Sequence, residues 1–113
     1  MSDNCNSKGC KAVLPPELRE EGLCLLHFTL KVEEQCSAIR RETTAGETTP
    51  ERHEELFDQI AGWGEAMVNV ATSGFSMTDE MKARILSTFL TLMNTRESVD
   101  RAAARRPLSR HFA

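Results

Sequence analysis

The chain has no tyrosine, and aromatic residues make up only 5% of its 113 residues. Proteins that bind single-stranded nucleic acids often stack bases on aromatic side chains, and such a surface is poorly supplied here. No apolar run approaches the roughly 18 residues needed to cross a bilayer. The opening residues, Met1-Ser2-Asp3-Asn4, are polar and lack the charged-then-apolar pattern of a secretion signal. We therefore expect a cytoplasmic protein that does not enter a membrane.

Neither positive nor negative side chains are in large excess, since the net charge is −3. Residues 45–75 carry six acidic and one basic side chain, whereas residues 101–113 carry four basic and no acidic ones. A dedicated nucleic-acid-binding protein is usually strongly basic over one face. Nucleic-acid binding through Lys8, Lys11 and the arginines of residues 101–113 is therefore an alternative that we do not favour.

Sequence motifs of common enzymes are missing as well. There is no glycine-rich phosphate loop, and no serine or cysteine stands at a recognisable spacing from a histidine and an acid. No small-molecule substrate is evident. We expect a protein that is not an enzyme.

Four residues near the start have the spacing of a zinc site. Cys5 and Cys10 are separated by four residues, and Cys24 and His27 follow after 13 more. Zn²⁺ prefers thiolate and imidazole ligands, and four protein ligands close a structural site. In a reducing compartment, clustered cysteines are more often metal ligands than disulfides. We predict one structural Zn²⁺ ion bound by Cys5, Cys10, Cys24 and His27; unliganded cysteines and a disulfide are the alternatives.

The remaining cysteine, Cys36, lies nine residues beyond His27 on the same predicted helix. Nine residues correspond to about 13 Å along a helix axis and to its opposite side. Cys36 therefore cannot share a tetrahedral metal with Cys24, and we predict that it is a core residue.

The first predicted helix covers about residues 23–43. Its main apolar stripe consists of Leu25, Phe28, Val32, Cys36 and Ile39. A second stripe consists of Leu23, Leu26 and Leu30. We expect the N-terminal segment to fold back over Leu26 and Leu30, with Val13, Leu14 and Leu18 as the covering side chains.

The second helix is predicted to begin at Pro50 with Thr49 as its cap and to stop at Gly74. Its buried stripe is predicted to be Leu56, Ile60, Trp63, Met67, Val70 and Ala71. Gly62 and Gly64 disfavour a helix at this place. We prefer the interpretation in which Gly64 lets a neighbouring helix approach while Trp63 fills the core, over a pocket beside Trp63.

The third helix is predicted to open at Thr78-Asp79-Glu80 and to end near Ala104, before Pro107. Its apolar residues cover about half of its circumference: Met81, Ile85, Leu86, Phe89, Leu90, Leu92 and Met93. Such a helix contacts two neighbours, or one neighbour and a partner chain. His53 and His111 are expected to be exposed.

These patterns predict an all-α protein, an antiparallel three-helix bundle with an N-terminal zinc knuckle. Residues 1–27 form the knuckle leading into the first helix, residues 23–104 form the bundle in a single domain with it, and residues 105–113 form a flexible basic tail. The favoured function is a zinc-stabilised, non-catalytic interaction or regulatory adaptor module that binds a protein partner or, through the third helix, a second copy. The alternatives are a nucleic-acid-binding zinc-finger regulator and a zinc-thiolate redox sensor.

Overall fold

The computed structural model describes the backbone of residues 4–46 and 48–111, and the side chains of these residues up to Ala104. A short 3₁₀ turn, η1 (Pro16–Leu18), precedes three helices, α1 (Leu25–Ala45), α2 (Pro50–Thr72) and α3 (Asp79–His111). Within these described ranges there is no β-strand, and Asn4 and Val13 form one isolated antiparallel bridge.

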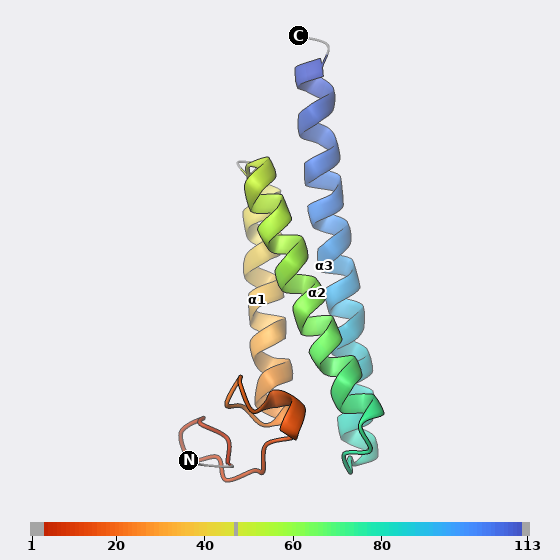
Figure 1. The fold of residues 1–113 in the computed structure, drawn as a ribbon. Coiled ribbons are helices and arrows are strands. Elements are labelled where there is room, and N and C mark those ends of the chain that lie inside the picture. Colours follow the sequence, from red (N-terminus) through yellow and green to blue (C-terminus); the bar gives the residue numbers. More distant parts are fainter. Residues whose placement is uncertain (1–3, 47, 112–113) are drawn as a thin grey trace.

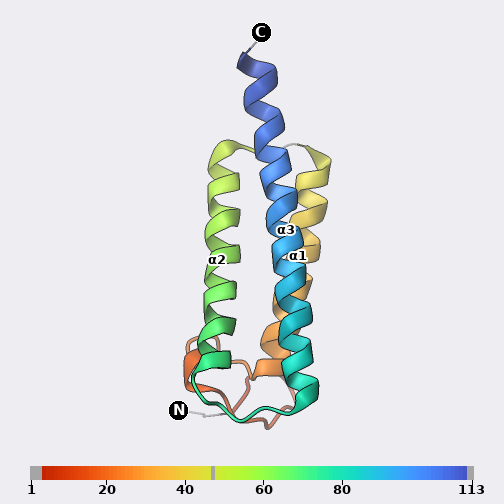
Figure 2. The same ribbon diagram turned by 90° about the vertical axis from the view of Figure 1, so that its right-hand side faces the viewer.

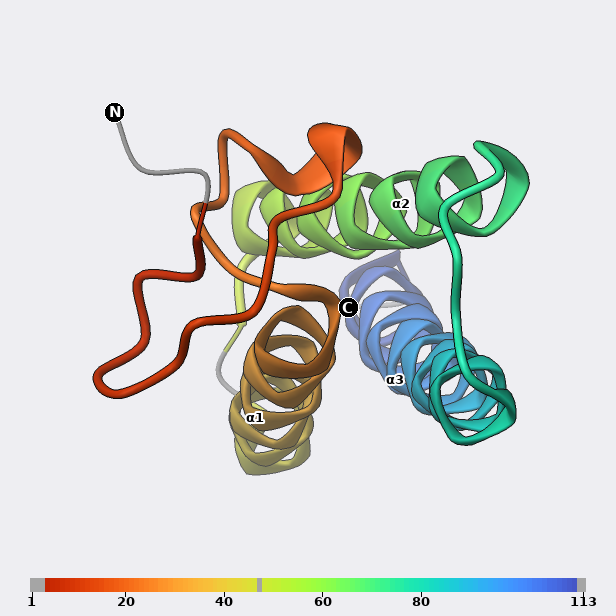
Figure 3. The same ribbon diagram turned by 90° about the horizontal axis from the view of Figure 1, so that it is seen from below.

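Consecutive helices run in opposite directions, so that α1 and α3 are parallel and α2 is antiparallel to both (Figure 1). α3 packs against both other helices, most closely against α1. Seen along the bundle, the three helices occupy the corners of a triangle (Figure 3). The predicted all-α three-helix architecture is therefore confirmed.

The helix boundaries follow from local capping. The Thr49 hydroxyl accepts a hydrogen bond from the Arg52 backbone N–H at 3.1 Å, and Pro50 occupies the first position of α2. At the start of α3, the Thr78 hydroxyl accepts from the Met81 N–H at 3.2 Å. α1 is capped after Ala45 by Gly46, which has the left-handed φ of 76° that glycine adopts without strain.

The main apolar stripe of α1 is buried as predicted. Cys36 is fully buried within it, which confirms its assignment to the core. The core consists of Leu18, Leu25, Phe28, Val32, Cys36, Ile39, Leu56, Ile60, Met67, Val70, Ile85, Leu92 and Val99. On α2 the predicted stripe is wrong at Ala71, which is exposed, and Trp63 is only partly buried.

The predicted cover over the second stripe of α1 is wrong. Leu26 and Leu30 remain 42% and 43% exposed, and Val13 is 65% exposed. Leu18 is instead fully buried in the main core, because η1 lies close to α2 rather than on the outer face of α1. Leu14 packs in a small separate cluster with Cys5 and Cys24.

The expected role of Gly64 is also wrong. A Cβ atom added at Gly64 would meet no atom within 4 Å, so no neighbouring helix needs the space. Gly64 instead lines an open groove of about 300 Å³ between α2 and α3, together with Phe89 and Met93 among others. Trp63 lies against the core and is not among the residues that line this groove.

His53 is not exposed as predicted. Its side chain is buried, and its Nε2 atom lies 2.6 Å from the hydroxyl oxygen of Thr48 in the segment before α2. Exposure was predicted because the first turn of a helix is usually solvated, whereas here Thr48 contacts the His53 side chain. His111 lies outside the described side chains.

The interface between α1 and α3 contains polar side chains that apolar periodicity does not reveal. The Glu33 carboxylate accepts hydrogen bonds from the Thr88 hydroxyl at 2.7 Å and from the Arg84 guanidinium at 3.2 Å. The Arg84 Nε–H also donates to the Thr29 hydroxyl at 2.7 Å. Thr29 and Thr88 are fully buried, and this network satisfies their hydroxyl groups.

α3 continues beyond its predicted end near Ala104, through Pro107 to His111, and extends past the other two helices (Figure 2). A proline lacks the N–H that a helix interior uses, which is why the sequence predicted an end there. The side chains of residues 105–113 lie outside the described ones, and the flexibility of this segment stays a prediction. None of the described helices combines the length and the apolar character that a membrane span requires.

Candidate metal centre

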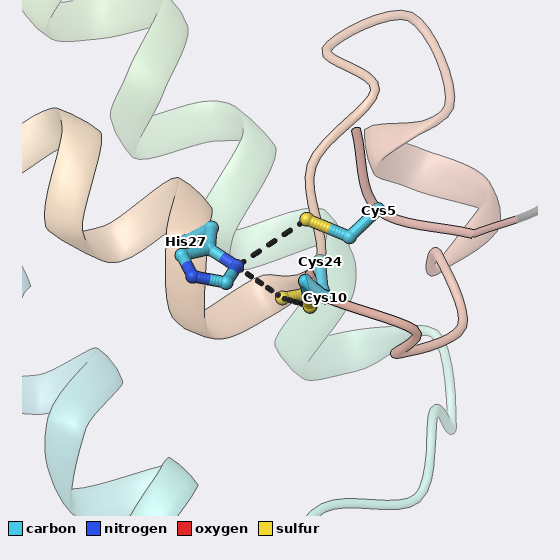
Figure 4. A group of neighbouring side chains, drawn as sticks. All are labelled: Cys5, Cys10, Cys24 and His27. Atoms are coloured by element: carbon cyan, nitrogen blue, oxygen red, sulfur yellow. Dashed lines mark hydrogen bonds between the residues drawn. The ribbon is translucent and has the colours of Figure 1, made fainter. Parts of the chain in front are cut away.

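The first two candidate ligands lie on a tight loop at the start of the chain. The Cys5 N–H donates to the Ala12 carbonyl at 2.9 Å, and the Cys10 N–H donates to the Ser7 carbonyl at 2.9 Å. Gly9 has a φ of 79°, which allows the chain to turn back between the two cysteines. These bonds direct both sulfur atoms toward the start of α1 (Figure 4).

The second pair lies at the start of α1. Cys24 is the residue immediately before the helix and His27 lies in its first turn, so that a spacing of three places both on one side. The loop is attached here by the Asn6 N–H, which donates to the Gly22 carbonyl at 2.8 Å. Gly22 has a φ of 70°, which favours glycine, and a Cβ added there would displace the side-chain amide of Asn6.

The four ligand atoms of Cys5, Cys10, Cys24 and His27 lie within 4.8 Å of one another. The Nδ1 atom of His27 lies 3.3 Å from the sulfur of Cys5 and 3.3 Å from the sulfur of Cys24 (Figure 4). The sulfur atoms of Cys10 and Cys24 are 3.9 Å apart. Zn–S and Zn–N bonds of about 2.3 and 2.0 Å at tetrahedral angles separate the ligand atoms by about 3.5–3.8 Å. The structure thus brings the four predicted residues together in a group that could hold a metal ion.

Burial and local hydrogen bonding act on the two innermost thiols in different ways. Burial raises the pKa of Cys5, but backbone N–H groups of Cys24 and Ser7, with the His27 side chain, stabilise its thiolate and lower the pKa to about 6. The pKa of the Cys24 thiol is raised, first by burial and also by the neighbouring sulfur atoms. A divalent cation would supply the positive charge that several adjacent thiolates need.

The residues would hold Zn²⁺ through three thiolates and one imidazole, with every tetrahedral position taken by the protein. A catalytic zinc keeps a position for water or substrate, so this ligand set suits a structural ion. None of the four cysteines, which all lie in the described part of the chain, forms a disulfide. Cys36 is not a member of the group.

Sequence reasoning found the ligands but missed the residues that position them. Asn6 and Ser7 hold the loop through backbone atoms, which carry no sequence signature. Gly22 is a further positioning residue, because its φ of 70° suits glycine and its carbonyl accepts the hydrogen bond from the loop at Asn6.

No known protein family, curated protein or solved structure matched this chain. The interpretation of the site therefore depends on its own residues and geometry.

Proposed function

We propose that the protein is a non-catalytic interaction module in which one structural Zn²⁺ ion, held by Cys5, Cys10, Cys24 and His27, attaches the N-terminal segment to a helical bundle. The observation that supports this most strongly is the convergence of four protein ligands from two distant segments. A tetrahedral site with four protein ligands has no position for a substrate, so the ion has a structural rather than a catalytic role.

The attached segment also contributes to the core. Leu18 lies between the two ligand pairs in the sequence and is fully buried among residues of the bundle. The ion would restrict the chain on both sides of Leu18 and so reduce the entropy lost when Leu18 packs. Because metal binding and folding are thermodynamically linked, loss of the ion lowers the stability of the bundle.

The surface between α2 and α3 supports the partner-binding part of the proposal. We define the α2–α3 surface by Gly64, Val68, Leu86, Leu90 and Met93. Val68 is 44% exposed, and the three α3 side chains are 61–66% exposed. Gly64 and Met93 line the groove of about 300 Å³. Contiguous exposed apolar side chains rimmed by polar ones are typical of protein-interaction sites.

The metal part is tested with the purified full chain. We expect one zinc ion per chain by elemental analysis, and a melting temperature that falls when a strong chelator removes it. A chain that carries no stoichiometric metal, and melts at the same temperature with or without chelator, would contradict the structural-zinc part.

The partner-binding part is tested with zinc-loaded full chain immobilised as bait for native lysate, in three forms. Wild type and Leu26→Glu, which changes an exposed leucine on α1, should retain the same proteins. Leu90→Glu places a charge between the exposed Leu86 and Met93 of the α2–α3 surface and should lose them. Retention by all three forms, or by none, counts against this surface as a binding site.

A redox-sensing role is the second candidate, supported by the position of Cys10. Its side chain is only half-buried, and its sulfur lies 3.9 Å from that of Cys24. One hydrogen peroxide and the two thiols would give one disulfide and two waters, and loss of these ligands would release the metal. Zinc release at near-stoichiometric peroxide, followed with a chromogenic chelator, supports this role; retention in large excess excludes it.

A further inference from the structure

Seven exposed residues follow one another along a single face of α3. They are Asp79, Lys82, Leu86, Leu90, Met93, Glu97 and Arg101. Successive members are three or four residues apart, the spacing that places side chains above one another on a helix. We call this set the outer α3 face. Read along the helix, it presents an acid, a base, three apolar side chains, an acid and a base.

When a second copy of this face lies antiparallel to the first, the two sequences of charges are complementary. In an antiparallel copy whose two-fold axis passes near Leu90, Asp79 lies opposite Arg101 and Lys82 lies opposite Glu97 of the second copy. Each pair therefore joins opposite charges, while the apolar centre lies against the same centre. A parallel copy would place each charge opposite an identical one. From this self-complementarity we propose that the protein forms a two-fold symmetric dimer through antiparallel contact of the outer α3 faces, a proposal that rests on the interaction role inferred above.

The charged ends are available for such pairing. Lys82 and Asp79 are exposed and have no ion-pair partner among the side chains that the structure describes. Glu97 and Arg101 pair within their own helix, yet their side chains remain 59% and 68% exposed. In the dimer, each end would become a four-charge group that joins this pair to Lys82 and Asp79 of the second copy. Antiparallel helix dipoles favour the same orientation.

The three apolar side chains at the centre of the outer α3 face are largely exposed to solvent. Leu86, Leu90 and Met93 are 66%, 61% and 62% exposed, although α3 is packed on α1 and α2 along its other sides. Met93 also forms part of the wall of the groove beside Gly64. Leu86 of the second copy would lie opposite Met93, at the edge of that groove. The sequence predicted such a broad apolar helix, and the structure leaves one side of it uncovered by the described residues.

The size of this face sets the strength expected of the dimer. Asp79 and Arg101 are 22 positions apart, which corresponds to about 33 Å of helix, and a helix is about 10 Å across. The face therefore covers on the order of 300 Å², less than the roughly 800 Å² per partner that a standard interface buries. We expect reversible association, with a dissociation constant in the micromolar range or above.

The first test is the mass of the zinc-loaded full chain by sedimentation equilibrium over a range of concentrations. One chain weighs 12.6 kDa, so the dimer weighs 2 × 12.6 = 25.2 kDa. Wild type and Leu26→Glu should approach the dimer mass at high concentration, whereas Leu90→Glu should stay monomeric with an unchanged circular dichroism spectrum. A monomeric wild type at millimolar concentration overturns the dimer, and so does equal weakening by the two substitutions.

The second test determines whether the two α3 helices of the dimer are antiparallel or parallel. Lys82→Glu and Glu97→Lys should each weaken the dimer by raising its dissociation constant several-fold, because each places like charges together at both ends. The double variant re-forms opposite pairs across an antiparallel contact and should recover much of the lost affinity. In a parallel dimer, like charges face one another in all of these variants, so absence of recovery overturns the antiparallel arrangement.

These outcomes separate the dimer from the proposed interaction role. A monomeric wild type combined with Leu90-dependent capture of other proteins from lysate overturns the dimer alone. A monomeric wild type without such capture overturns both proposals.

Discussion

The sulfur of Cys5 lies 3.3 Å from the Nδ1 atom of His27, although 22 positions separate the two residues in the chain. The contact joins the N-terminal loop to the first turn of α1 and brings a thiol and an imidazole to the separation expected for two ligands of one zinc ion. Between these two residues lies Leu18, which is fully buried in the bundle core. The candidate metal centre and the packing of the bundle are therefore connected through one short stretch of chain.

Two cysteine substitutions distinguish a ligand from a core residue. Cys24→Ala removes one of four clustered ligand atoms and should abolish stoichiometric zinc. Cys36→Ala should retain one ion per chain, while the small cavity it leaves in the core costs about 1 kcal/mol of the free energy of unfolding. Elemental analysis and urea unfolding of both variants check this. Loss of zinc from the Cys36 variant would show that the ligand assignment is wrong.

Leu18 and Leu26 provide a matched pair of leucines in different environments. Leu18 is fully buried and Leu26 is 42% exposed. Leu18→Ala should lower the free energy of unfolding by about 2–5 kcal/mol, because it removes buried surface and leaves a cavity. Leu26→Ala should change it by about 0.5 kcal/mol or less. Similar losses in urea titrations of the two variants would show that the N-terminal segment covers α1, as the sequence had suggested.

The buried contact between His53 and Thr48 can be measured by a double-mutant cycle. The two side chains are 2.6 Å apart at the beginning of α2. His53→Ala should cost about 1–3 kcal/mol, since it leaves the buried threonine hydroxyl with one partner fewer. The cycle with Thr48→Val should yield a coupling of about 0.5–1.5 kcal/mol in urea unfolding. Additive effects would mean that the hydrogen bond contributes nothing to stability.

The ion pair between Glu42 and Arg52 predicts a pH dependence. The hydrogen-bonded Arg52 guanidinium, 2.7 Å away, is the main cause that lowers the pKa of the Glu42 carboxyl in the folded protein. The ion pair therefore stabilises the folded protein fully above the pKa of Glu42 in the unfolded chain, about 4.3. This stabilisation is lost as the pH falls through the lower pKa that Glu42 has in the folded protein.

We expect the free energy of unfolding of wild type to decrease more steeply below about pH 4.3 than that of Glu42→Gln. Urea titrations of both proteins at a series of pH values measure this difference. Parallel curves would show that the pair has no effect on stability.

Glycine substitutions test the space beside the groove. The position of Gly64 is helical and an added Cβ meets nothing within 4 Å, so Gly64→Ala should raise the free energy of unfolding by up to about 1 kcal/mol. Gly74 is the matched control, because its φ of 85° disfavours any side chain. Gly74→Ala should cost about 1–2 kcal/mol. A destabilising Gly64→Ala in thermal or urea unfolding would contradict the open groove.

Local patterns in the sequence determined the three helices, their caps and the candidate ligands. Thr49 and Thr78 act within three residues, and Cys24 and His27 are brought together by one helical turn, so neighbouring residues contain the necessary information. The same reasoning correctly placed Cys36 in the core, because helical geometry alone separates it from the ligands.

Only the tertiary structure decided which faces meet. Apolar periodicity marks a side chain that can be buried, but it does not name the neighbour that buries it. Leu18 therefore packs into the bundle while Leu26 and Leu30 stay exposed, and His53 is buried in contact with Thr48. The hydrogen bonds of Arg84 and Thr88 to Glu33 span more than 50 positions, and such pairings depend on the relative placement of whole helices.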